Sequence, residues 1–563
     1  MVFFSCRQII IMLRSIKEIT KVGVLVPVCG SLLLSSCQNF SSTNGDENKK
    51  APLRLEKKDP QPSRILASAK PGLLNANELK VLLRKHGENT SASRKADALF
   101  SSPFIDNSAY RKNGLPKPTQ HPKLGASLRV STWNIEKSIH VKEVAEILSS
   151  EQKYISKLQE VVTADSKKYA EALRQRSDIA SSDILLCQEM DIGHCRSEYV
   201  FAAQHLAKKM GLNFVYAPQQ LEIDPSYLGV SDVKFENTDA PTEVCSDLSR
   251  YKGVFGVAVL SRYPIKRVQV FPLKTESYDW YAGEILRPDF VEKGRRLGAK
   301  RLFNINPTRE VKKGGRGFTR VDLHVPGVPH ETISVINIHL EIKVGPETRV
   351  KQIEEILSYI SEIKNPVIMA GDFNSASRDV SSTSLWKASS GAVKEPSNIA
   401  SAGLFLANVT GVNQVRGILN GYKNFQNPIA WNIPAIFPSK TRSLFKCIQN
   451  FRFADGGAFD FRGDRKRSIN KKSGLLANSN QRSKFKGFTQ TFALPNTIGP
   501  VGCERLDWIF VKSFLTDPKD KRGPYRLAPH FGETLYHVNI SMRKKYSDHH
   551  PITTVLPLTE PDL

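Results

Sequence analysis

The chain has 563 residues, of which 40% are hydrophobic and 24% are charged, so it carries enough apolar material for a large core and is not a wholly disordered chain. Its 81 lysines and arginines outnumber its 55 acidic residues and give a formal net charge of +26. This excess disfavours cationic substrates and favours phosphate-rich ones, which include nucleic acid, anionic lipid and inositol phosphates.

The N-terminal segment has the order of a targeting signal. Basic residues at positions 14–21 precede an apolar run at 22–34, which is followed by Leu34-Ser35-Ser36-Cys37. The run is shorter than the about 20 residues that a transmembrane helix needs. This order resembles a bacterial lipoprotein signal, in which the cysteine is lipidated and becomes the mature N-terminus. We expect residues 1–37 to be a signal peptide with a lipobox, Cys37 to carry the lipid, and the protein to lie in the cell envelope on a membrane; a plain secretory signal is the alternative.

Residues 38–127 are rich in serine, asparagine, lysine and proline, and one short helix is predicted at 77–85. We interpret this segment as a polar tether. A flexible chain of that length would average about 50 Å from end to end, which would hold a domain clear of a membrane.

From residue 128 to residue 558 the pattern changes to short apolar strands with few amphipathic helices. The helices are predicted at 199–210, before Gly211, and at 347–363. Their number is small beside that of the strands, which indicates a layered α/β domain with paired sheets rather than a doubly wound fold. The strands are predicted at 128–134, 183–188, 214–217, 254–261, 318–324, 332–339, 367–370, 506–511 and 552–556.

Two stretches interrupt this pattern. Residues 293–320 contain ten basic residues and one acid, Glu310. Residues 375–502 form a long insertion between two strands, with a second basic run at 462–486. A loop of that length is usually functional or disordered.

Five cysteines follow Cys37, so at least one of them stays free if the others form disulfides. Their pairing does not follow from the sequence. We interpret Cys187, inside an apolar strand, as a small core residue.

Polar side chains that can bind metal recur at the ends of the apolar strands. The ends of neighbouring strands can present such side chains to one rim of a sheet, where oxygen ligands can hold a hard cation and a water beside it. Each segment alone is a weak signal, but six in one chain are hard to reach by chance. They lie at residues 131–136, 185–189, 337–340, 371–374, 505–508 and 547–551.

Together these segments resemble the endonuclease/exonuclease/phosphatase superfamily, which includes pancreatic deoxyribonuclease, apurinic endonucleases, neutral sphingomyelinases and inositol-polyphosphate 5-phosphatases. The resemblance covers roughly residues 128–558, with the motifs in family order. Its most specific pieces are Gln188-Glu189, Gly371-Asp372-Phe373-Asn374 and Ser547-Asp548-His549. It implies a four-layered α/β sandwich, in which two mainly antiparallel β-sheets pack face to face with helices outside.

The resemblance also implies a magnesium site, with manganese or calcium as alternatives. Glu189 would be the principal ligand, and Asn134 and Glu136 would lie close to the metal. Asp548 would reach a second metal site.

The catalytic roles that the resemblance implies fall on five residues. Asp372 would orient or deprotonate the attacking water, and Asn374 would hold that water and a phosphate oxygen. Asp507 would hydrogen-bond His549, which would act as general base or electrostatic clamp. His339 would donate to a non-bridging phosphate oxygen.

The expected activity is metal-dependent hydrolysis of a phosphodiester by a nonspecific nuclease acting outside the cytoplasm. Arg295, Arg296, Lys300 and Arg301 are candidate contacts to a nucleic-acid backbone, although a charge run is usually only a solvated surface. The alternatives are a phosphoesterase that acts on sphingomyelin, another phospholipid or an inositol phosphate, and an inactive surface-binding module. The intact set of catalytic side chains argues against the inactive module.

Overall fold

The computed structural model describes residues 68–164, 166–229, 241–244, 247–275, 277–285, 308–375, 442–461, 488–498, 501–515, 524–540 and 542–561. Among these residues no helix combines the length and the apolar character that crossing a membrane requires.

The larger of two main sheets has ten strands, and only its central pair, β4 and β5, is parallel. Two strands lie off the main order: β12 (Lys312–Gly314) pairs with β6, and β3 (Thr119–His121) pairs with β4. The main order is β1 (Ser68–Ala69), β2 (Phe104–Asp106), β6 (Asn213–Glu222), β9 (Val254–Ser261), β5 (Ile184–Ile192), β4 (Gly125–Asn134), β22 (Ile552–Pro557) and β21 (His530–Thr534).

The smaller sheet has five strands, and it too contains one parallel pair, β14 with β15. Every residue of β14 is buried, as expected for a strand that is covered on both faces. The order is β10 (Ile265–Pro272), β13 (Gly317–His324), β14 (Thr332–His339), β15 (Val367–Asp372) and β18 (Asp507–Lys512).

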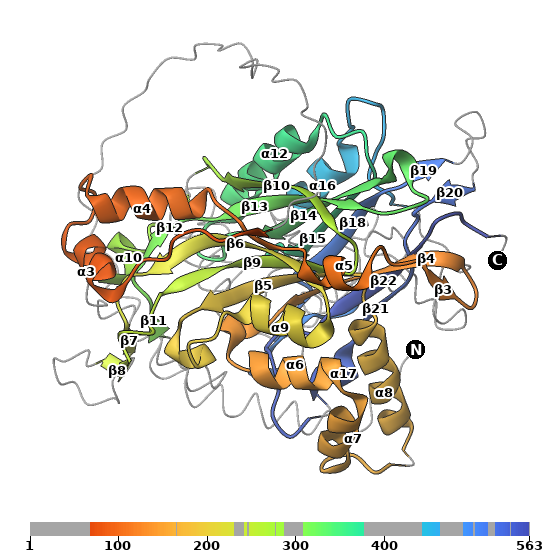
Figure 1. Cartoon of the computed structure of the whole chain (residues 1–563), viewed down its shortest axis with the longest axis horizontal. Helices are drawn as coiled ribbons and strands as arrows, with labels where there is room; N and C mark the ends of the chain where they lie inside the picture. Colours follow the sequence, from red (N-terminus) through yellow and green to blue (C-terminus); the bar gives the residue numbers. More distant parts are fainter. Residues whose placement is uncertain are drawn as a thin grey trace, which may run out of the picture. The chain divides into compact units, whose positions relative to one another are not determined.

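The two sheets pack face to face around a shared apolar core that includes Val130, Leu186, Val335 and Ile368. A second core lies between the outer face of the large sheet and helices α3 (Ala76–Arg84), α4 (Ser91–Phe100), α6 (Val141–Ser149), α7 (Glu151–Gln159), α8 (Lys167–Ala180), α9 (Ala202–Met210) and α17 (Tyr536–Ile540). A third joins the small sheet to α12 (Pro346–Ile360) and α16 (Arg442–Asn450) (Figure 1). The predicted four-layered sandwich is therefore confirmed.

The remaining described elements are short and lie at the edges of this sandwich or in its connections. They are α5 (Ser108–Asn113), α10 (Ala282–Ile285), the three-stranded sheet of β11 (Thr308–Arg309), β7 (Ser226–Gly229) and β8 (Pro241–Val244), and the pairs β16 (Phe492–Ile498) with β17 (Val501–Glu504) and β19 (Phe514–Leu515) with β20 (Tyr525–Arg526).

All nine predicted strands are present, with ends that differ by a few residues. The three predicted helices, at 77–85, 199–210 and 347–363, are present as well, as α3, α9 and α12. α9 ends where Gly211 takes a left-handed conformation (φ 69°), and α12 ends three residues earlier than predicted.

The predicted tether at residues 38–127 is wrong for residues 68–127. β2 pairs with β6, β1 pairs with β2, and β3 pairs with β4, so this segment extends the large sheet. The buried faces of α3 and α4 join the core beneath them. The folded unit therefore begins well before residue 128, and residues 38–67 lie outside the described residues.

The described parts of the 375–502 insertion also belong to the fold. α16 packs against α12 and contributes Leu444, Phe445 and Ile448 to the core. The ring of Phe445 lies 4.6 Å from that of Trp508 on β18. The basic run at 462–486 lies outside the described residues.

Three of the five cysteines have described side chains. Cys187 is buried and free in β5, which confirms that it is a core residue, and Cys447 is also free. Cys195 is in a disulfide.

Candidate functional site

Three strand pairings bring distant polar residues to one edge of the sandwich. In the parallel pair β4–β5, Asn134 lies opposite Gln188. In the small sheet, Asp372 lies between His339 on β14 and Asp507 on β18. Parallel strands end at the same edge, so the polar ends of both sheets gather on one rim.

The two sheets are joined at this edge by buried amides. Gln188 Nε2 donates to Asn337 Oδ1 at 2.8 Å, and Asn337 Nδ2 donates to the carbonyl of Ala258 at 2.7 Å. Gln188 therefore has a structural role beside the site, since buried amides rarely lack partners.

The backbone of β15 also passes very close to that of β14 just before Asp372. Gly371 has φ 138°, and a Cβ at this position would lie 2.0 Å from the carbonyl oxygen of Ile338. Only glycine fits this position in front of Asp372.

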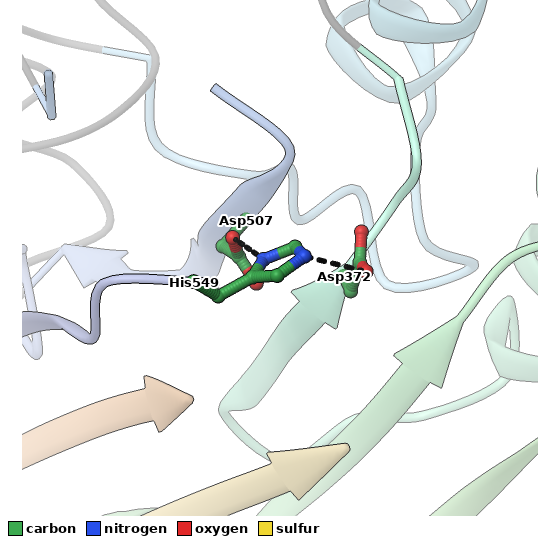
Figure 2. A group of neighbouring side chains, drawn as sticks. All are labelled: Asp372, Asp507 and His549. Carbon is green, nitrogen blue, oxygen red and sulfur yellow. Dashed lines mark hydrogen bonds and ion pairs between the residues drawn. The ribbon is translucent and has the colours of Figure 1, made fainter. Parts of the chain in front are cut away.

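Asp372, Asp507 and His549 form the centre of the site, with ligand atoms all within 4.8 Å of one another (Figure 2). The imidazole lies between the two carboxylates: His549 Nδ1 is 2.8 Å from Asp507 Oδ2, and His549 Nε2 is 3.8 Å from Asp372 Oδ2. Burial alone would lower the pKa of His549, but the Asp507 carboxylate holds it well above the usual value. The predicted Asp507–His549 dyad is therefore assembled, and its carboxylate favours the protonated form of the imidazole.

The loop that carries His549 is fixed by buried hydrogen bonds. Ser547 Oγ donates to the carbonyl of Asn134 at 2.7 Å and accepts from the His549 amide at 3.0 Å. The indole of Trp133 donates to the His549 carbonyl at 3.0 Å. The ring of the next residue, His550, lies 4.6 Å from that of Tyr536, and burial lowers its pKa to about 3.

Asp372 accepts hydrogen bonds at both of its carboxylate oxygens. Asn134 Nδ2 donates to Oδ2 at 3.0 Å, and the Asn374 amide donates to Oδ1 at 2.8 Å. Burial raises the pKa of Asp372 to about 7, against the lowering effect of His549. Asn374 has φ 45°, and its side-chain amide donates to the Leu340 carbonyl at 2.9 Å. Because a side-chain amide carries two hydrogens, the second can serve a ligand.

His339 is oriented by a residue that sequence reasoning did not place in the site. Arg316 lies 2.9 Å from His339 Nδ1, and a guanidinium can only donate, so Nδ1 accepts and the proton of the neutral ring is on Nε2. Burial and the charge of Arg316 hold the pKa of His339 well below its usual value. His339 Nε2 lies 3.6 Å from Asp372 Oδ2 and 3.9 Å from Glu189 Oε1, so it faces the same space as the dyad.

Three further carboxyl groups lie beside this centre. Glu189 has φ 58° and accepts from the Lys137 amide at 3.0 Å. Glu136 accepts from the Asp548 amide at 2.9 Å. Burial and then the charges of Asp548 and Glu189 raise the pKa of Glu136 to about 8, and burial raises that of Asp548 to about 6.

These carboxyl groups fit a divalent cation. Glu136 lies close enough to Asp548 and Glu189 for their charges to act on it, and burial raises the pKa values of Glu136 and Asp548. The ligand atoms of Asp372, Asp507 and His549 also lie within 4.8 Å of one another, but His549 Nδ1 is already hydrogen-bonded to Asp507. The cation is therefore better served by Glu189, Glu136 and Asp548, with Asn134 adjacent.

The basic segment at 293–320 does not have the surface character expected of it where it is described. Lys312 is buried and lies 2.7 Å from Glu310, and Arg316 is buried against His339. The sequence analysis counted both residues with the other basic residues of the segment at 293–320. Nothing in their spacing distinguished them from a surface run. The candidate contacts Arg295, Arg296, Lys300 and Arg301 lie outside the described residues.

Comparisons with known proteins agree with this fold. A sequence profile of the Endonuclease/Exonuclease/phosphatase family matches residues 131–549. A comparison with curated proteins gave no match.

Solved structures align with about three quarters of this chain at low sequence identity. An endonuclease/exonuclease/phosphatase from Beutenbergia cavernae is 14% identical, with a TM-score of 0.36, over 77% of this chain and 72% of that one. A humanized D. rerio TDP2 with 14 mutations is 12% identical, with a TM-score of 0.32, over 76% and 98%. An AP endonuclease from Archaeoglobus fulgidus is 14% identical, with a TM-score of 0.32, over 76% and 99%.

Proposed function

Because the chain belongs to the endonuclease/exonuclease/phosphatase family, we propose that it is a divalent-metal-dependent phosphoester hydrolase whose substrate is a nucleic-acid backbone. The observation that carries this proposal is the convergence of an Asp507–His549 pair, Asp372, neutral His339 and Glu189 on one rim. Hydrolysis of a phosphodiester needs a positioned water, donors for the phosphate oxygens and a cation, and these side chains supply or hold each of them.

The residues divide the chemistry among them. Asp372 is fixed by Asn134 and Asn374, so its carboxylate can accept a proton from a water held beside it. His339 carries its proton on Nε2 and can donate to a phosphate oxygen, whose negative charge grows during attack. His549, whose Nε2 lies 3.8 Å from Asp372 Oδ2, stabilises that charge as an imidazolium.

Glu189, Glu136 and Asp548 would hold the cation, and Asn134 lies next to them. A bound magnesium ion would neutralise the phosphate oxygens and promote ionisation of a coordinated water. No covalent intermediate on the protein is required.

A nucleic-acid substrate is supported by the net charge of +26 and by the exposed residues Arg543, Lys544 and Lys545, which lie shortly before Asp548 in the chain. A basic surface binds a nucleic acid through many weak phosphate contacts that add to the affinity, whereas a single lipid head group offers only one or two charges.

One observation favours a second candidate, a phospholipid or sphingomyelin phosphodiesterase. Ile139 follows the Glu136 turn and is 37% exposed, and Ile342 follows His339 and is 43% exposed. Two exposed aliphatic side chains on loops that leave the site would suit a substrate with an acyl chain, although single exposed apolar residues are common.

We further propose that Cys37 anchors the mature protein to a membrane in the bacterial cell envelope. The support is the order of basic, apolar and small residues before Cys37. This location would give the enzyme access to nucleic acid outside the cytoplasm.

The test is an assay of the mature protein against plasmid DNA, RNA, sphingomyelin vesicles and inositol phosphates, each with magnesium and with chelator. We expect hydrolysis of DNA or RNA that chelator abolishes and that Glu189→Gln reduces to background without loss of fold. Hydrolysis of sphingomyelin alone would move the assignment to the lipid enzyme. Normal turnover by Glu189→Gln would show that the site is wrongly placed.

A further inference from the structure

Glu310 is the single acid in the basic segment at 293–320, and it is buried beside the proposed metal site. It lies between β11 and β12, where β12 adds to β6 with Lys312 opposite Glu222. The added strand thus brings a carboxylate from an otherwise basic segment into the interior. Buried carboxylates are rare unless paired, so its partners show what it does.

Glu310 belongs to a buried network of three carboxylates and three cations. Its own partners are Lys137, Lys312 at 2.7 Å and Arg196 at 3.2 Å. Arg196 also pairs with Asp191 and with Glu222, at 2.7 Å each. Removing the Glu310 carboxylate would take an acidic partner from Lys137, Lys312 and Arg196 at once, and the side chains of the last two are buried.

The Lys137 partner links this network to the metal site. Lys137 is the middle residue of a turn in which Glu136, Lys137 and Ser138 have φ values of 44°, 52° and 57°. Such left-handed conformations are unfavourable for residues other than glycine and persist only when the surroundings hold them. Here the Lys137 ammonium is held by Glu310, while the Lys137 amide donates to Glu189 Oε2 at 3.0 Å.

The far side of the turn is held as well. Ser138 Oγ donates to the carbonyl of Glu189 at 3.0 Å and accepts from the Asp191 amide at 3.1 Å. The turn therefore presents Glu136 and an amide donor to the carboxylates of the site, and the Lys137–Glu310 pair is one of the side-chain contacts that hold it.

We propose that Glu310 is a positioning residue for the metal site: through Lys137 it holds the strained 136–138 turn, and thereby the orientation of Glu189 and Glu136. The inference rests on the proposed function because it assumes a cation at these carboxylates. Groups that orient metal ligands typically change metal affinity by about 10- to 100-fold when they are replaced.

The test is binding of Mn²⁺ alone, measured by isothermal titration calorimetry on the mature protein. We expect Glu310→Gln to weaken binding by about 10-fold or more. The matched control is Asp455→Asn, which breaks the ion pair with buried Lys512 (2.7 Å). Lys512 lies at the opposite end of β18 from Asp507, five residues away, or roughly 17 Å along the strand. Both variants should lower the melting temperature, but the control should leave Mn²⁺ affinity unchanged.

Mn²⁺ binding is also measured for Lys137→Gln and for the double variant Glu310→Gln/Lys137→Gln. If Glu310→Gln does not fold, Lys137→Gln tests the same contact from its other side. Because both side chains act through one contact, the double variant should bind Mn²⁺ about as weakly as either single variant. Unchanged affinity in Glu310→Gln or Lys137→Gln, or multiplicative losses in the double variant, would overturn the inference. A wild type that binds no Mn²⁺ would instead overturn the proposed function, and the inference with it.

Discussion

Replacing Asp507 by asparagine removes the charge that holds His549 as an imidazolium while keeping nearly the same side-chain shape. At the observed 2.8 Å, two unit charges attract by about 6 kcal/mol at an effective dielectric constant of about 20. Burial of the pair cancels part of this attraction, since the desolvation cost opposes it. We therefore expect kcat to fall by about 10³- to 10⁴-fold, equivalent to about 4–5.5 kcal/mol of transition-state stabilisation.

The assay is steady-state hydrolysis of the substrate identified for the wild type, with His549→Ala and the double variant measured in parallel. Since Asp507 acts through His549, all three variants should lose similar activity, and KM should change by less than about threefold. Asp183→Asn is the matched control because Asp183 is equally buried and pairs with Arg262 at 2.7 Å, but it precedes the opposite end of β5 from Glu189. It should lower stability and leave kcat near normal.

A double variant whose loss equals the product of the two single losses would show that Asp507 and His549 act independently. A loss below about tenfold in Asp507→Asn would show that the imidazolium charge is not used in the reaction. Either result would refute the dyad.

Three further predictions concern other parts of the chain. Gly371→Ala should lower the free energy of unfolding in urea by about 3 kcal/mol or more, because its Cβ would lie 2.0 Å from the Ile338 carbonyl oxygen; a loss below about 1 kcal/mol would contradict the close packing. Replacing Arg295, Arg296, Lys300 and Arg301 by alanine should flatten the salt dependence of DNA binding, by about 0.9 in log–log slope for each phosphate that the variant no longer neutralises; an unchanged slope would mean that these residues only solvate a loop. The wild type should partition into membranes and Cys37→Ala should not be processed, and mass spectrometry that finds another mature N-terminus in the wild type would exclude lipidation at Cys37.

The sheets were predictable because each strand is a short run of β-branched or apolar residues, and both faces of most strands are buried. The segment at 68–127 was misread because its overall composition is polar and β2 has only three residues. A local signal was present nonetheless. Asn75 caps α3 and stands three residues before Glu78, and the two form a capping box that marks the start of a helix.

In the candidate site, too, the sequence motifs predicted which residues are present but not how each side chain is oriented. Each reactive group lies in a recognisable strand-end motif, but its orientation is set by a partner from elsewhere in the chain. Asn134 and Asp507, which orient Asp372 and His549, happen to lie in motifs themselves. Arg316, which sets the tautomer of His339, lies in a basic run that resembled a solvated surface.

Lys137 extends this reasoning to the metal ligands. Its hydrogen bond to Glu189 is made by the backbone amide, so no side-chain pattern could have revealed it. That amide is in place only because three consecutive residues adopt left-handed conformations, and Glu310, 173 residues away, holds the side chain of the middle one. Relatives can therefore keep the same strand-end motifs and still differ in metal affinity, because the residues that orient the ligands lie in segments that the motifs do not constrain.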